Sequence, residues 1–470
     1  MKFFGLFLLT LVWASAAVAR KPNILMILAD DMGYGDLGCM GSKVLQTPHL
    51  DALAKSGVLC TQGYVPSSVC SPSRAGILTG RDPRRFGYEG NLNKGPNAYP
   101  TRPELQGLPV TEHTLADHLK SAGYATGLIG KWHQGMSAPF HPNVRGFDHF
   151  VGMLSGSHTF FLKPEKHKLE GNGTPLTEFS NSYITDFFTD ECVKFIDDKK
   201  EQAWFLFASY NAPHTPMEAT EEDLARFPNI QNKKRRIYAA MMYALDRGVG
   251  RLVKKLSESG QLEDTLIVFF SDNGGATNNA SWNGPLSGRK GTLAEGGVRV
   301  PFIFSWPGTI PSDKTFGKPV SALDLLPTFM AAAGKKPLAL RKAPGYEDRK
   351  NRLKTAPFDG INLLPALQGK RENPPRLLHW RLQGQSALLF GEHKLITFTH
   401  RPAQLFRPAD DPGEATDLSI SEKDVFLDLF TRMGKWQSGL ATTPLWDSSP
   451  RWWAESSKNY DTARPVPEPE

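Results

Sequence analysis

Cysteine is scarce in this chain, with four residues (Cys39, Cys60, Cys70 and Cys192) among 470. So few thiols exclude a fold that depends on a dense disulfide framework. Beyond the first residues there is no long apolar run, and no run of basic residues interleaved with aromatics occurs. These absences argue against further membrane spans and against nucleic acid as a partner. No internal repeat is apparent.

The N-terminus has the form of a secretory signal peptide. Lys2 precedes an apolar run, and Ala17-Val18-Ala19 has the small-x-small pattern of a cleavage site. An N-terminal anchor is the alternative, but the run is short for a membrane span and lacks a stop-transfer flank. We therefore expect residues 1–19 to be removed and the mature protein to be secreted or periplasmic, with no membrane anchor.

Apolar runs alternate with helical segments over residues 20–335. Runs typical of strands buried on both faces occur at 23–29, 125–129, 204–208, 266–270 and 302–304. Helices are expected at 47–57 (with Thr47 as cap and Gly57 as stop), 114–122, 238–258 and 321–333. This alternation predicts an α/β domain with a large, mixed, mostly parallel sheet sandwiched between helices.

The sequence changes character after residue 335. Residues 336–357 are rich in Lys, Arg and Pro without an apolar period, which predicts an exposed basic connector. Short strands are then expected at 377–381, 386–390 and 394–398, with a helix at 422–435. Residues 358–454 are therefore predicted to form a smaller C-terminal subdomain on an antiparallel sheet, and 455–470 a disordered tail.

Cys70 lies in the segment Cys70-Ser71-Pro72-Ser73-Arg74, just before a short apolar run. Pro72 suits the first turn of a helix, and Ser71 or Ser73 could cap its start. A helix N-terminus and the charge of Arg74 would both stabilise an anion beside position 70, which makes Cys70 a candidate nucleophile. A buried structural thiol in a turn is the alternative that these residues leave open.

Oxygen-bearing side chains follow two of the predicted strands. Asp30 and Asp31 come after the first strand, and Asp272 and Asn273 after a later one. In open α/β sheets, ligands bind beyond the carboxyl ends of the strands. Adjacent acids favour a bound cation, although a solvated turn or a helix cap is also compatible with the pair. An all-oxygen set favours Ca²⁺ or Mg²⁺ over zinc, and the amide of Asn273 favours Ca²⁺.

Lysine and histidine side chains lie in loops near the same predicted edge. They are Lys131, His133, His214 and Lys290. The spacing of Lys131 and His133 predicts that both lie on one side of an extended segment. Each of the four has an alternative interpretation as a surface lysine or a core histidine. Together they supply the cations and donors that an oxyanion ester requires.

The segment around Cys70 resembles the Cys-x-Pro-Ser-Arg signature of the sulfatase family, in which the cysteine is oxidised after translation to formylglycine. Further segments resemble sulfatase motifs, in family order: Asp30-Asp31, 123–133, Pro213-His214, 271–274 and 288–291. The resemblance implies an alkaline-phosphatase-like fold and a sulfuric ester hydrolase of arylsulfatase type. Gln134 stands where leucine is common in the family, and we expect it not to touch the chemistry.

The resemblance also implies a role for each candidate. The residues that match calcium ligands are Asp30, Asp31, Asp272 and Asn273, together with the formylglycine at position 70. The residues that match those holding the formylglycine or handling the sulfate are Arg74, Lys131, His133, His214 and Lys290. A formylglycine-generating or equivalent maturation enzyme is an implied partner.

The expected reaction is hydrolysis of a sulfate monoester. A hydrated aldehyde has one hydroxyl to attack sulfur and a second to expel the sulfate, and Ca²⁺ would polarise the sulfate oxygens. The departing alcohol needs a proton, for which His214 is the first candidate and Lys290 the alternative. His133 is expected to assist the hydrated aldehyde.

The expected substrate is a sulfated carbohydrate, with a small sulfate ester as a surrogate. The formal net charge of +7 is compatible with an acidic substrate. One alternative is a phosphoester or phosphonate monoester hydrolase of the same superfamily, which usually needs a second metal or further acidic and histidine ligands. The other is a non-catalytic glycan-binding relative, which would lack some of the catalytic positions.

Overall fold

The computed structural model describes residues 21–92, 106–163, 168–338, 358–440 and 468–469. The predicted signal peptide, most of the basic connector and most of the C-terminal tail lie outside these ranges. Within them, no helix combines the length and the apolar character that a membrane span requires. All four cysteines are free thiols.

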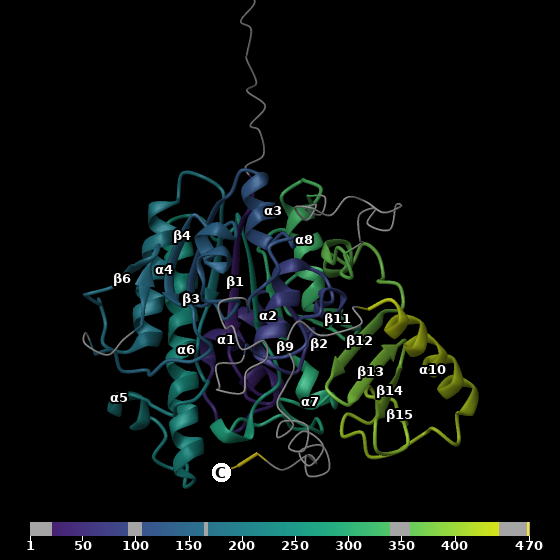
Figure 1. Ribbon diagram of the computed structural model, residues 1–470. Helices are drawn as coiled ribbons and strands as arrows, with labels where there is room; N and C mark the ends of the chain where they lie inside the picture. The colour runs from purple at the N-terminus through teal and green to yellow at the C-terminus, as the bar shows by residue number, and fades with distance from the viewer. Residues whose placement is uncertain (1–20, 93–105, 164–167, 339–357, 441–467, 470) are drawn as a thin grey trace, which may run out of the picture.

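Most of the described chain folds around one eleven-stranded sheet (Figure 1). Its strands, in spatial order, are β10 (Lys314–Phe316), β2 (Val58–Tyr64), β9 (Arg299–Ser305), β8 (Thr265–Ser271), β1 (Asn23–Ala29), β7 (Trp204–Ser209), β3 (Ala125–Lys131), β4 (His149–Met153), β5 (Glu170–Gly171) and β6 (Thr174–Pro175), with β11 (Val320–Ser321) beside β2. The central strands β8, β1, β7, β3 and β4 are parallel, whereas β9 runs antiparallel between β8 and β2. The predicted mixed, mostly parallel sheet is confirmed.

Helices cover both faces of this sheet because each central strand sends alternate side chains into two different cores. In β1, Leu25 and Ile27 enter one core, and Met26 and Leu28 enter the other. The first core packs beneath α1 (Pro48–Lys55), α4 (Ile184–Asp198), α5 (Glu221–Leu224) and α6 (Lys233–Glu258). The second packs beneath α2 (Cys70–Thr79), α3 (Leu115–Ser121), α8 (Leu325–Ala332) and α9 (Leu364–Leu367).

Local sequence accounts for several helix boundaries. Thr114 begins α3 with a capping box to Asp117, and the helix stops before Gly123, whose φ of 83° suits glycine. Thr47 is the N-cap residue of α1 and Pro48 its first residue, as predicted, but the Thr47 hydroxyl accepts from the Gly38 amide and makes no bond to the helix amides. Helix α6 begins earlier than predicted because Asn232 caps its first turn.

The C-terminal part forms a separate four-stranded antiparallel sheet, which lies at the lower right of Figure 1. Its elements are β12 (Leu377–Leu382), β13 (Gln385–Phe390), β14 (His393–Phe398), β15 (Gln404–Phe406) and the helix α10 (Lys423–Ser438). One face packs on Tyr64 and Val298 of the larger unit, and the other packs on Leu429 of α10. Sequence predicted this smaller sheet.

Candidate active site

The carboxyl ends of the parallel strands carry the candidate site. Asp30 and Asp31 follow β1, Lys131 ends β3, and Asp272 follows β8. All four residues are buried, with at most 1% of their surface exposed. The strands therefore bring together residues that are far apart in the sequence, at the edge where open α/β sheets bind ligands.

Cys70 is the first residue of helix α2, and the residue before it is Val69. The predicted capping of this helix by Ser71 or Ser73 is wrong. The Ser71 hydroxyl donates to the His133 carbonyl, and the Ser73 hydroxyl donates to the Asp272 carbonyl, so neither is available to the helix. Asn91 does the capping from another segment, since its Oδ1 accepts from the Ser71 amide at 2.9 Å.

The Cys70 thiol faces a carboxylate and the ammonium group of a lysine. Its Sγ lies 3.7 Å from Asp31 Oδ1 and accepts from Lys290 Nζ at 3.1 Å. Burial raises the pKa of the Cys70 thiol to about 12, even though the charges of Lys131 and Lys290 lower it. The unmodified cysteine is thus a protonated thiol at neutral pH, which is a poor nucleophile.

Arg74 and Lys131 each bind a carboxylate of the site. Arg74 Nε donates to Asp272 Oδ2 at 2.8 Å, and its Nη1 donates to Ser209 Oγ at 2.7 Å. Lys131 Nζ donates to Asp30 Oδ2 at 2.6 Å. Although burial opposes it, the charge of Lys131 lowers the pKa of Asp30 well below its usual range. Asp30 is therefore ionised in the folded protein.

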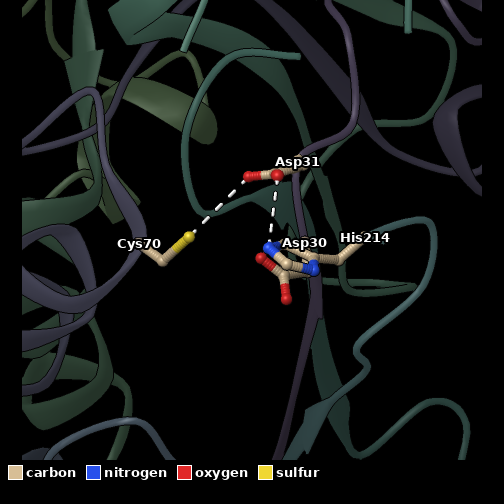
Figure 2. Close-up of side chains that lie close together, drawn as sticks. All are labelled: Asp30, Asp31, Cys70 and His214. Atoms are coloured by element: carbon tan, nitrogen blue, oxygen red, sulfur yellow. Dashed lines mark hydrogen bonds and ion pairs between the residues drawn. The ribbon is translucent and has the colours of Figure 1, made fainter. Parts of the chain in front are cut away.

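A group of possible metal ligands lies at the centre of the site (Figure 2). One ligand atom from each of Asp30, Asp31, Cys70 and His214 lies within 4.8 Å of the others. His214 was not among the ligands predicted from sequence. The predicted ligand Asn273 is adjacent, since its Nδ2 donates to Asp31 Oδ1 at 2.8 Å.

Unsatisfied oxygens support a cation at this point. Asp30 Oδ1 and Asn273 Oδ1 are buried, and neither has a hydrogen-bond partner among the described residues. Buried oxygens without a partner are costly unless an ion or water binds them. Burial, assisted by the charge of Asp30, raises the pKa of Asp272 to about 7. A divalent cation would offset this crowding of carboxylates, and the oxygen-rich donor set fits Ca²⁺.

His133 and His214 are both neutral, because burial lowers the pKa of each. His214 Nδ1 lies 2.7 Å from the Thr215 carbonyl, so that nitrogen carries the proton and Nε2 faces Asp31 Oδ2 at 3.5 Å. Burial lowers the pKa of His214, and burial together with the charge of Lys131 lowers that of His133. The predicted extended segment at His133 is wrong, since β3 ends at Lys131 and His133 has a φ of 57°.

Several residues that hold the site were not predicted from sequence. Ser209, at the end of β7, binds both Arg74 and the Lys131 carbonyl. Gln134, which was expected not to touch the chemistry, donates to the carbonyls of Ser71 and His133. Asn279 Nδ2 donates to the carbonyls of Asp31 and Pro213. A single polar residue after a strand or in a loop is too common a pattern to identify such roles.

Comparisons with known proteins identify the family of this chain. The Sulfatase family model matches residues 22–335. The N-acetylgalactosamine-6-sulfatase of Canis lupus familiaris is 33% identical over 405 residues, which cover 82% of this chain and 73% of the dog protein. Arylsulfatase A of Homo sapiens is 33% identical over 463 residues, covering 90% of this chain and 84% of the human protein.

Solved structures extend the comparison to the whole fold. The structure of Ps i-CgsB in complex with k-i-k-neocarrahexaose has 37% identity and a TM-score of 0.81, and the match covers 93% of this chain and 98% of that one. A phosphonate monoester hydrolase of Agrobacterium radiobacter shares the fold at 18% identity and a TM-score of 0.60, with 89% of this chain and 95% of that one covered. With a family match over most of its length and relatives of this identity, the chain belongs to the sulfatase family and is a sulfuric ester hydrolase of alkaline-phosphatase-like fold.

Proposed function

We propose that this protein hydrolyses sulfate monoesters of a carbohydrate after Cys70 has been converted to formylglycine. The observation that carries the proposal is the environment of Cys70. Lys290 and Asp31 both contact its Sγ, yet burial keeps the thiol protonated with a pKa of about 12. A complete set of acids and cations thus surrounds a side chain that is inert in its unmodified form.

The modified residue would supply the chemistry that the thiol lacks. When hydrated, formylglycine supplies a hydroxyl nucleophile for sulfur and a second hydroxyl whose deprotonation lets the sulfate leave. Position 70 suits this role because it is the first residue of α2, whose N-terminal amides favour negative charge nearby. The residue is 1% exposed, which keeps bulk water from the reacting group.

We further propose that calcium binds between Asp30, Asp31, Asp272 and Asn273, next to position 70. The unsatisfied oxygens of Asp30 and Asn273 support this ligand set, and Mg²⁺ is a weaker candidate because it demands a more regular shell. The ion would polarise sulfate oxygens as a Lewis acid. Lys131 fits a supporting role, because its Nζ already neutralises Asp30 at 2.6 Å.

The proton for the departing alcohol is best supplied by His214. Its Nδ1 proton is committed to the Thr215 carbonyl, so the proton for the alcohol must be a second one, taken from solvent onto Nε2. Asp31 Oδ2, at 3.5 Å from Nε2, would stabilise the imidazolium until it gives that proton to the leaving oxygen. Although burial opposes it, the charge of Asp31 raises the pKa of Lys290 well above its usual value. Lys290 therefore retains its proton, and its role is to offset negative charge on the transferring sulfate.

A sulfated carbohydrate is the proposed substrate class. The family match and the curated relatives support sulfate ester hydrolysis, and a similar solved structure, at 37% identity, holds a neocarrahexaose. The phosphonate monoester hydrolase is similar only in fold, at 18% identity. These findings favour sulfated oligosaccharides over phosphonates as the first substrates to assay.

The proposal is tested by measuring inorganic sulfate and phosphate released from an aryl sulfate, its phosphate analogue and a panel of sulfated oligosaccharides. We expect sulfate release to dominate, to vanish on chelation, and to return with Ca²⁺ more fully than with Mg²⁺. Cys70→Ala should abolish turnover while circular dichroism stays unchanged. Sulfate release by Cys70→Ala, or faster phosphate release by the wild type, would contradict the proposal.

A further inference from the structure

The loop that presents Lys290 to the site, Ser287–Glu295, is attached at its tip to the larger unit. The Lys290 amide donates to the Gly275 carbonyl at 3.1 Å, and the Gly291 amide donates to the Ser68 carbonyl at 2.9 Å. Lys290 Nζ then reaches Cys70 Sγ and Asp31. The ends of this loop also carry backbone bonds, since the Ser287 amide donates to the Pro412 carbonyl at 3.3 Å and the Gly296 amide donates to the Ser287 carbonyl. A side chain of the C-terminal subdomain then joins the two ends.

Both ends of the Lys290 loop are held by one oxygen of Glu414, a residue of the C-terminal subdomain. Glu414 Oε2 accepts from the Ser287 hydroxyl, and the same atom accepts from the Glu295 amide at 2.9 Å. The Glu414 side chain is 2% exposed. Hydrogen bonds to a buried carboxylate are about twice as strong as those between neutral groups.

The charge of Glu414 is balanced by a lysine of the same subdomain. Lys394 Nζ lies 3.0 Å from Glu414 Oε1 and 2.8 Å from Glu295 Oε1, and its side chain is fully buried. Tyr64 and Arg299 complete the cluster by contacting Glu295 Oε2. Two cations, Lys394 and Arg299, thus face two buried carboxylates, and a buried cluster balanced in this way favours one arrangement of the groups it joins.

The backbone at Glu414 is itself in an uncommon conformation. Its φ is 47°, in the left-handed region where residues with a side chain pay a steric cost. Strain of this kind persists only when surrounding contacts demand it. The bonds from Glu414 Oε2 to Ser287 and Glu295 are contacts of this kind, because they hold the side chain while the backbone keeps its positive φ.

From these contacts we infer that Glu414 is a positioning residue for Lys290, through which the C-terminal subdomain sets the geometry of the active site. Glu414 touches neither Cys70 nor Asp31, and acts by fixing the two ends of the loop that carries Lys290. The inference rests on the proposed role of Lys290 at the transferring sulfate. The C-terminal subdomain then contributes to the geometry of the active site, in addition to packing on the larger unit.

A double-mutant cycle between Glu414→Ala and Lys290→Ala tests the inference, with kcat and KM measured for an aryl sulfate. Glu414→Ala alone should lower kcat about 10- to 100-fold with little change in KM, since a displacement of about 1 Å can cost 10²-fold. In the Lys290→Ala background, the same change should lower kcat less than about twofold, because the group it positions is gone. Glu414→Gln keeps an acceptor at the same place and should retain kcat within about threefold.

Two further variants keep the test decisive. Ser287→Ala removes one of the two bonds to Glu414 Oε2 and leaves the ion pair of Glu414 with Lys394 in place. It therefore reports on the coupling between Glu414 and Lys290 if Glu414→Ala fails to fold. Arg376→Ala is the matched control. Arg376 Nη1 lies 2.7 Å from Asp324 Oδ2 in a buried ion pair that involves no residue of the Lys290 loop. This variant should lower the thermal midpoint and leave kcat unchanged.

The possible failures can be told apart. If Glu414→Ala or Ser287→Ala lowers kcat equally with and without Lys290, the effect does not pass through Lys290 and the inference is overturned. If Lys290→Ala itself leaves kcat unchanged, the proposed role of Lys290 fails first, and the positioning role with it.

Discussion

His133 depends on a neighbour that has no side chain. A Cβ atom added to Gly156 would lie 2.5 Å from Nε2 and 2.6 Å from Cε1 of the His133 ring. His133 has a φ of 57°, and its carbonyl accepts from Ser71 and Gln134, so its backbone cannot easily shift. The ring alone can move, which makes glycine at position 156 a condition for the present position of the imidazole.

Gly156→Ala should therefore displace the His133 ring and lower kcat by about 10- to 100-fold, because small displacements of a catalytic group are costly. Stability should change by less than about 1 kcal/mol, since the clash is with the end of a side chain. Gly434→Ala in α10 is the matched control, because a Cβ there meets nothing within 4 Å. Equal kcat in both variants would show that His133 has no part in the rate.

At the scale of elements, an acid on α6 fixes the start of α1. Asp246 accepts from the backbone amides of His49 and Leu50 at 3.2 and 2.8 Å, which satisfies two donors that the helix itself leaves free. The Asp246 side chain is fully buried, and burial raises its pKa from 3.8 to about 6. Two helices far apart in the sequence are joined by this one carboxyl group.

The raised pKa of Asp246 makes the free energy of unfolding of the protein depend on pH. Asp246 binds its proton more tightly in the folded protein than in the unfolded chain, so its contribution is largest below pH 4 and is lost as the pH rises through about 6. Relative to Asp246→Asn, the free energy of unfolding of the wild type should fall by about 2–3 kcal/mol between pH 4 and pH 7. Urea unfolding at several pH values measures this, and parallel curves would contradict it.

The sequence predicted elements well where a pattern was strong and local. The apolar run at β1 is a signal of this kind, and the helix predicted at 114–122 lies close to the observed bounds of α3. Strand β2 was not predicted, because Thr61 and Gln62 interrupt its apolar character. Helix α4 was also missed, because its N-cap Tyr183 provides no side-chain cap and gives no start signal.

At the scale of the whole molecule, the meeting of the site residues was predictable from sequence. The contact between the C-terminal subdomain and the Lys290 loop was not. Acids and cations that follow buried strands converge because parallel strands end at one edge, so their meeting could be expected. The contact between Ser287 and Glu414 joins residues 127 positions apart, in loops outside both sheets. No periodicity or motif connects them, and only the packing of the small sheet on the large one brings them together.

The central claim is that the working group at position 70 is no longer a cysteine. It is tested most directly by mass spectrometry of the peptide that spans Cys70, taken from a preparation whose sulfate release has been measured. The claim predicts that this peptide carries an aldehyde in place of the thiol, in a fraction that rises with specific activity across preparations. An unmodified Cys70 thiol throughout a fully active preparation would contradict it.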